Sequence, residues 1–145
     1  MVSLNDLADR PPRPLAHREV IDLGGKRVRY LDTPHVPHAW ESGLIDEETT
    51  RTLFTGDLVT QLGDGPALSA QPIVKATIAA EEQFHATALT AATASTIRTL
   101  KALRPELLAV MHGSCFAGDC ASELESLAAY CETRLQAGIS DQGQD

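Results

Sequence analysis

Histidine and aspartate residues that could bind a metal ion follow three short β-rich or aliphatic runs of this sequence. His35 and His38 lie in the run Thr-Pro-His-Val-Pro-His, where two prolines stiffen the chain and reduce the entropy lost when an imidazole is fixed. Asp57 follows a Phe-Thr-Gly run, and a carboxylate in that place can bridge two cations. His112 follows the third run, Leu-Leu-Ala-Val-Met. These residue types favour a metal site.

Taken singly, each of these residues is an ordinary loop residue, and composition and spacing alone leave the function open. The hypothesis depends on the strand ends meeting at one edge of a sheet, where loop side chains converge. The other two histidines, His17 beside a proline cluster and His85 in a threonine-rich segment, receive no chemical role.

Four short strands are predicted before any long helix. Two β-rich runs flank Gly24-Gly25, which is a hairpin signal, and two more flank a polar stretch. A fifth strand is predicted where an aliphatic run ends at His112. The expected strands cover residues 19–23, 27–31, 43–46, 52–55 and 107–111.

Helices are expected mainly in the second half of the chain. Residues 58–72 contain several glycines and prolines and are predicted to form a surface loop. One or two helices are predicted between residue 74 and Pro105. The last helix has an apolar face at intervals of three and four, with Asp119 as its cap and Gly138 at its end. The order of elements predicts a layered α/β domain.

The domain division follows from these elements. Residues 1–18 are interpreted as a short helix over 3–10 and a proline-rich linker, 19–138 as the folded domain, and 139–145 as a tail. A length of 145 residues suits one domain.

Charge and cysteine content exclude several classes of function. The formal net charge of −8 argues against a surface for nucleic acid or for anionic membranes, so small molecules, metals or proteins are the expected partners. No stretch is apolar enough to span a bilayer, which predicts a soluble cytoplasmic protein. The three cysteines lack CxxC spacing, so free thiols are expected.

The stretch from Glu19 to His112 resembles the C-terminal half of the metallo-β-lactamase superfamily. Four segments carry the resemblance, in the order in which the family has them: Val20-Ile21-Asp22-Leu23-Gly24-Gly25, Thr33-Pro34-His35-Val36-Pro37, Thr55-Gly56-Asp57 and Met111-His112-Gly113-Ser114. The resemblance implies a sheet-and-helix half of the family's αββα sandwich.

The resemblance also implies a site and a reaction. His35 and His112 would each bind one of two zinc or iron ions, and Asp57 would bridge the two ions and act in catalysis. His38 is the alternative to His35. Metal-dependent hydrolysis of a small-molecule substrate is the implied function. The Pro-His-x-Pro-His pattern with Trp40 is similar to the di-iron branch, which handles oxygen or nitric oxide.

One family motif is missing from the 145 residues. The His-x-His-x-Asp-His motif, which supplies four of the usual ligands and precedes the first hairpin in the full fold, does not occur. We therefore expect a half-domain that binds metal weakly by itself and is inactive alone. A partner chain could supply the missing half, the chain could form a homo-oligomer, or it could be a non-catalytic interaction domain.

Overall fold

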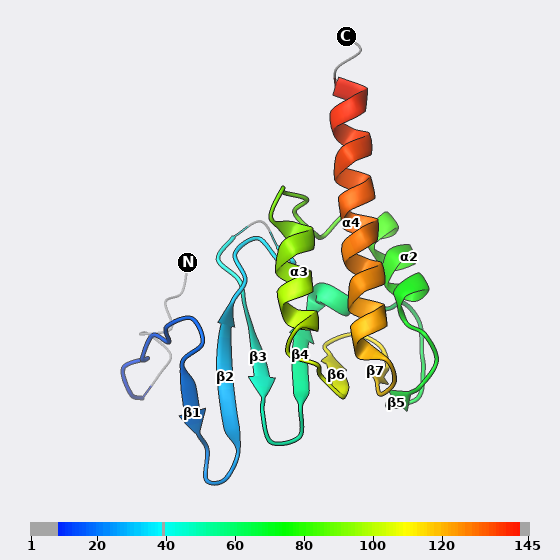
Figure 1. Ribbon diagram of the computed structural model, residues 1–145. Helices are drawn as coiled ribbons and strands as arrows, with labels where there is room; N and C mark the ends of the chain where they lie inside the picture. The colour runs from blue at the N-terminus through cyan, green and yellow to red at the C-terminus, as the bar shows by residue number, and fades with distance from the viewer. Residues whose placement is uncertain (1–8, 39, 143–145) are drawn as a thin grey trace.

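The computed structural model describes residues 9–38 and 40–142, which form one mixed sheet of seven strands and three α-helices (Figure 1). Along the sheet the strands follow the order β1-β2-β3-β4-β6-β7-β5. The expected α/β class is confirmed. The strands are β1 (Val20–Asp22), β2 (Arg27–Asp32), β3 (Gly43–Glu47), β4 (Thr52–Gly56), β5 (Leu68–Ser69), β6 (Leu107–Val110) and β7 (Cys115–Phe116).

The first four strands form successive antiparallel pairs, as the sequence predicts. In the first turn the Asp22 carboxylate accepts hydrogen bonds of 2.8 Å from the backbone N–H of Gly24 and of Gly25. Both glycines have positive φ, a conformation that side chains disfavour. The chain later returns to place β6 parallel to β4. Strands β2, β4 and β6 therefore run in the same direction, and their carboxyl ends share one edge of the sheet.

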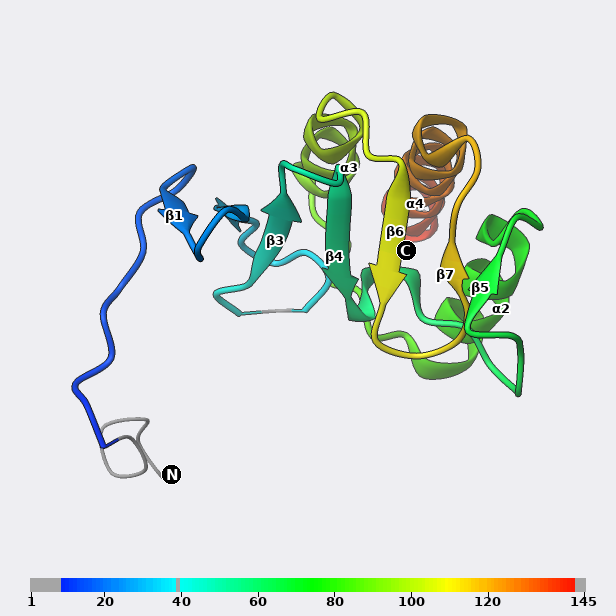
Figure 2. The ribbon, with the colours of Figure 1, turned by 90° about the horizontal axis from the view of Figure 1, so that it is seen from below.

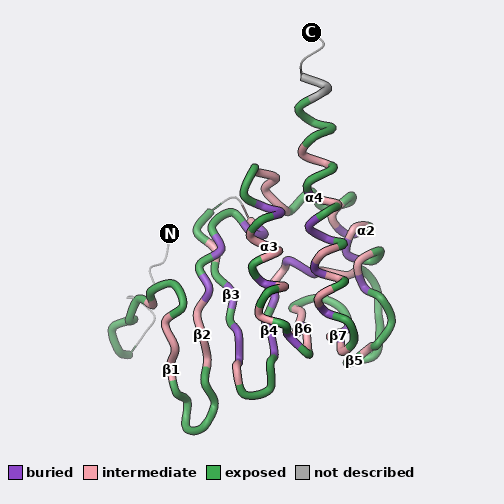
Figure 3. Tube along the Cα trace, in the orientation of Figure 1, coloured by how far each residue is buried: buried purple, intermediate pink, exposed green. Residues whose placement is uncertain are grey.

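Helices α3 (Thr93–Lys101) and α4 (Cys120–Gln142) lie on one face of the sheet, and α2 (Val74–Phe84) contacts α4 beside β5 and β7 at the end of the sheet (Figure 2). Aliphatic side chains fill the space between that face and the helices. Figure 3 shows that the buried residues lie mainly in the strands and helices that border this space. The largest fully buried side chains among them are Leu53, Ile97, Leu100, Leu108 and Leu124. Asp119 caps α4 as predicted, because its Oδ1 accepts a hydrogen bond from the N–H of Ser122 at 2.9 Å.

The two helices α2 and α3 lie in the predicted range before Pro105, whereas the predicted end of the last helix is wrong. Helix α2 ends at Phe84, since His85 adopts the left-handed conformation with φ 49° and donates its N–H to the Glu81 carbonyl at 2.8 Å. Helix α4 continues past Gly138 to Gln142. A glycine inside a helix costs only about 1 kcal/mol relative to alanine, which the neighbouring helix formers outweigh.

Some short elements were not predicted, and one prediction lies outside the described residues. The segment expected as a loop over 58–72 contains most of a short 3₁₀ helix, η1 (Asp57–Val59), and strand β5. Strand β7 was also missed. The helix predicted over 3–10 falls almost entirely outside the described part of the chain. No helix in residues 9–38 and 40–142 is both long enough and apolar enough to cross a membrane.

The sheet face opposite the helices carries an exposed row of apolar side chains. The register pairs Ile45 with Phe54, and strand alternation places Met111 and Leu68 on the same side. These side chains are 40% to 66% exposed. In Figure 2, α3 and α4 both lie on the other side of the sheet. We call the surface formed by Ile45, Phe54, Leu68 and Met111 the open sheet face.

Candidate metal centre

The loops after β2, β4 and β6 meet at one edge of the sheet. The N–H of Met111 donates to the Gly56 carbonyl at 3.3 Å, which holds the end of β6 beside the end of β4. Gly56 has φ 52° and ψ −130°, and this turn begins η1 with Asp57 as its first residue. His112 follows one residue after the contact with Gly56. The convergence of strand ends expected from the sequence is present.

The loop after β2 is held by several backbone contacts. The N–H of Thr33 donates to the Ser42 carbonyl at 2.8 Å and closes the base of the loop. The Thr33 hydroxyl donates to the Val36 carbonyl at 2.9 Å, and Val36 itself is fully buried. The N–H of Ala88 donates to the Pro37 carbonyl at 2.9 Å. The backbone just before His38 is therefore fixed from two sides.

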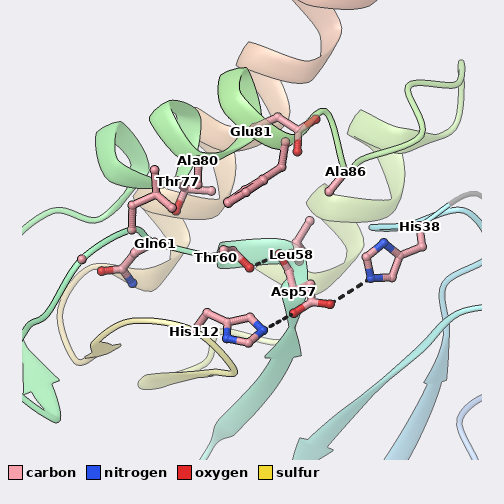
Figure 4. Close-up of a pocket in the computed structure, with 13 residues that line it drawn as sticks. His38, Asp57, Leu58, Thr60, Gln61, Thr77, Ala80, Glu81, Ala86 and His112 are labelled. Carbon is pink, nitrogen blue, oxygen red and sulfur yellow. Dashed lines mark hydrogen bonds and ion pairs between the residues drawn. The ribbon is translucent and has the colours of Figure 1, made fainter.

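Asp57 lies between two imidazoles (Figure 4). Its Oδ2 is 3.0 Å from Nε2 of His38, and its Oδ1 is 3.3 Å from Nε2 of His112. Each carboxylate oxygen thus faces a different ring. Oδ1 is buried and has no hydrogen bond within the described residues, so its contact with His112 is only an ion-pair distance. This arrangement leaves lone pairs on the carboxylate available to a cation.

Of the residues proposed from the sequence, Asp57 and His112 are brought together, and His38 rather than His35 joins them. His35 is at the corner of a turn, with φ 63°, and is exposed. Its ring makes no hydrogen bond or ion pair in the described part of the chain. Because Val36 inserts into the core, His35 faces outward, and the chain turns back only at His38. The preference for His35 over His38 therefore does not match this geometry.

His17 and His85 lie outside this group, as expected. His17 accepts a hydrogen bond through Nδ1 from the N–H of Asp32 at 3.1 Å. His85 caps α2 through its backbone.

Trp40 packs on His38 and was not predicted to do so. The two rings are stacked, with centroids 4.5 Å apart and an interplanar angle of 19°. The indole itself is 59% exposed. The N–H of His35 donates to the Trp40 carbonyl at 3.0 Å, and this hydrogen bond joins the two ends of the loop segment 35–40. The imidazole of His38 thus has an indole on one face and a carboxylate at its Nε2 edge.

A cavity of about 400 Å³ opens beside Asp57. Helix α2 supplies one wall, and the segment after η1 supplies another (Figure 4). Sequence reasoning missed this wall, although the helical spacing of residues 77, 80, 81 and 84 was available as a signal. The lining residues are His38, Asp57, Leu58, Thr60, Gln61, Leu62, Gly63, Thr77, Ala80, Glu81, Phe84, Ala86 and His112.

The distances from the two Asp57 carboxylate oxygens to the imidazole nitrogens of His38 and His112 suit two pairs of metal ligands. With metal–nitrogen and metal–oxygen distances of about 2.0 to 2.2 Å, two ligands of one ion lie roughly 2.9 to 3.5 Å apart. The separations of 3.0 and 3.3 Å at Asp57 match that range. No three His, Cys, Asp or Glu residues in the described ranges are grouped to hold a single ion. The residues therefore fit half of the ligands for two ions.

Comparisons with known proteins agree on the fold. No protein-family model and no curated protein matches the sequence. Rubredoxin oxygen:oxidoreductase from Desulfovibrio gigas matches with a TM-score of 0.67 and 20% identity, over 86% of this chain and 33% of that chain. The chemotaxis sensor ODP from T. denticola matches with a TM-score of 0.62 and 20% identity, over 76% of this chain and 47% of that chain.

A metallo-beta-lactamase family protein from Thermus thermophilus also matches, with a TM-score of 0.57 and 23% identity, over 88% of this chain and 38% of that chain. The expected metallo-β-lactamase fold is confirmed. The chain spans less than half the length of each of these three proteins.

Proposed function

We propose, from the metallo-β-lactamase fold of this chain and from the contacts of Asp57, that His38, Asp57 and His112 hold two divalent metal ions. The observation that carries the proposal is the division of the Asp57 carboxylate, with one oxygen facing each imidazole. A carboxylate placed in this way can be shared by two ions, each of which also has one histidine. Zinc and iron both accept imidazole and carboxylate ligands.

The reaction we propose is metal-dependent hydrolysis. Two bound ions lower the pKa of a shared water molecule and so supply hydroxide near neutral pH. In this chain Asp57 would hold both ions, and the loop before His38, which its backbone hydrogen bonds fix, would orient one imidazole. The cavity beside Asp57 falls in the size range of about 300 to 1,000 Å³ that is usual for organic ligands, which supports a substrate larger than a diatomic gas.

The remaining ligands must come from outside the described residues. A hydrolytic metal usually has about three protein ligands, whereas each ion here would have two. We propose that another polypeptide segment supplies them, either from a partner chain or from a second copy, and that it covers the open sheet face. The exposed apolar side chains of that face support this proposal, because such a surface on one protein usually marks an interface.

A di-iron centre that binds oxygen or nitric oxide is the second candidate. Two of the structural neighbours are a rubredoxin oxygen:oxidoreductase and a chemotaxis sensor with a diiron species. The pair of His38 and Trp40, which resembles the di-iron branch in sequence, is placed at the site. Anaerobic loading with ferrous iron followed by oxygen-uptake measurements would separate this function from hydrolysis.

Titration with Mn²⁺ followed by NMR tests the metal site in the chain as it is. A weak paramagnetic site broadens nearby signals even when few ions are bound. We expect selective broadening of the imidazole signals of His38 and His112, and its loss in Asp57→Asn. The matched control is His35→Ala, which removes a histidine from the same loop and should leave the broadening unchanged.

Two outcomes would contradict the proposal. Broadening that persists in Asp57→Asn would show that the carboxylate does not hold the ions. Broadening that disappears in His35→Ala would return the ligand role to His35.

A further inference from the structure

The cavity beside Asp57 has a mainly apolar wall on the side of α2. Phe84 is 55% exposed although it faces this cavity, and Ala80 lies one turn before it on the same helix. Leu58 and Leu62 approach from the segment after β4. Large apolar side chains that remain in contact with water can gain binding energy when an organic ligand covers them.

The charges around the cavity are unsuited to an anion. No lysine or arginine is among its lining residues in the described ranges, whereas Glu81 and Asp57 both contribute carboxylates. Glu81 already accepts hydrogen bonds from the N–H and the hydroxyl of Thr87. In the metal-free chain a negatively charged ligand body would therefore meet like charge, and no lysine or arginine of the lining would compensate it.

Thr77 offers a hydrogen-bonding group in the α2 wall. The residue is only 4% exposed, and its hydroxyl has no hydrogen-bond partner within the described residues. A buried hydroxyl without a partner costs about 1 to 3 kcal/mol, so a polar atom that reached it would be favoured.

We propose that this cavity binds the body of an uncharged organic molecule with an aromatic or aliphatic part and a polar group such as an amide or ester. The reactive end would lie toward Asp57, and the apolar part would lie against Phe84. The assignment of this molecule as a substrate rests on the proposed function, but its binding to the cavity does not, because the walls are built by this chain alone.

Benzamide and benzoate form a matched pair of probes, since they have nearly the same shape and differ in charge. Trp40 is the single tryptophan of the chain and stacks on His38, a lining residue, so its fluorescence can report binding. We expect the metal-free chain to bind benzamide at least tenfold more tightly than benzoate. Equal or tighter binding of benzoate would overturn the proposal.

Two phenylalanine variants locate the binding site. Phe84→Ala should weaken benzamide binding at least fivefold, while Phe54→Ala, which removes a ring of similar exposure on the open sheet face, should leave it unchanged. An unchanged affinity in Phe84→Ala would overturn the proposal. Thr77→Val should weaken benzamide binding two- to fivefold, and an unchanged affinity there would overturn the role of the hydroxyl.

These measurements use no metal. Failure of benzamide binding with intact Mn²⁺ broadening would reject the ligand class alone, and the reverse result would reject the metal site alone.

Discussion

The Trp40 indole lies nearly parallel to the His38 imidazole, with ring centroids 4.5 Å apart. At the edge of the same imidazole, Nε2 is 3.0 Å from Oδ2 of Asp57. The stack restricts rotation of the imidazole about its side-chain bonds, and the carboxylate selects the direction of Nε2. Trp40 is thus a positioning residue for His38, since it acts on a proposed ligand and does not itself contact Asp57.

Trp40→Ala should weaken metal binding, because the freed imidazole must lose rotational entropy when it binds. Loss of a group that orients a ligand typically lowers metal affinity by about tenfold or more. Trp40→Phe keeps an aromatic ring and should restore most of the affinity. Isothermal titration gives the affinities, and NMR relaxation of the His38 ring reports its mobility. Equal losses in both variants, with an unchanged ring mobility, would show that the stack has no positioning role.

Asp57→Asn should change metal binding far more than stability. The turn at Asp57 is closed by its backbone carbonyl, which accepts hydrogen bonds from the N–H and the hydroxyl of Thr60 at 3.2 and 2.9 Å. The carboxylate is not needed for these contacts. Chemical denaturation should therefore give a change in unfolding free energy within about 0.5 to 1 kcal/mol.

A larger loss of stability in Asp57→Asn would identify the carboxylate as structural. Thr60→Val is the matched control, because it removes a turn contact and should reduce stability without removing the site.

Most strands were predictable because their signals are local. Turn glycines and alternating apolar residues define the first hairpin, and the aliphatic run before His112 defines β6. The edge of the sheet at which the candidate site lies was predictable from the same strands, once their direction was assumed. Strands β5 and β7 have two residues each, which is too short for a periodic pattern.

The choice between His35 and His38 was not predictable, because it depends on three-dimensional contacts. Both histidines follow a proline, and local sequence does not show which one turns inward. Burial of Val36 and the hydrogen bond from Ala88, which lies beyond α2 in the sequence, decide the direction of the loop. The wall that α2 adds to the cavity beside Asp57 was not predictable for a similar reason, because it depends on where α2 ends.

The stability of the protein should fall in acid partly through Glu47. Its carboxylate accepts hydrogen bonds from the hydroxyl and N–H of Thr50 and from the N–H of Thr49, and these contacts lower its pKa from 4.5 to about 2. The folded state therefore favours the ionised form. This contribution is fully present above about pH 5 and is lost as the pH falls toward 2.

Unfolding measured at several pH values should show this dependence. Glu47→Gln should be less stable than the native protein at pH 6, and the difference should shrink toward pH 2. Thr50→Val should reduce the dependence because it removes the strongest donor. A constant difference between pH 6 and pH 2 would contradict the assignment.

The open sheet face should cause the isolated chain to self-associate. Apolar side chains there are exposed by 40% to 66%, and burying one such side chain stabilises a contact by about 1 to 3 kcal/mol. Sedimentation velocity at roughly 50 µM, a concentration in the range where exposed apolar surface promotes association, should show dimers or larger species.

Ile45→Lys combined with Phe54→Lys should restore a monomer, since the introduced charges lie opposite each other in neighbouring strands and resist desolvation. Leu23→Lys changes an equally exposed residue in the first turn, outside this face, and should leave the association intact. A native chain that sediments as a monomer would contradict the proposal that this face is covered by another polypeptide.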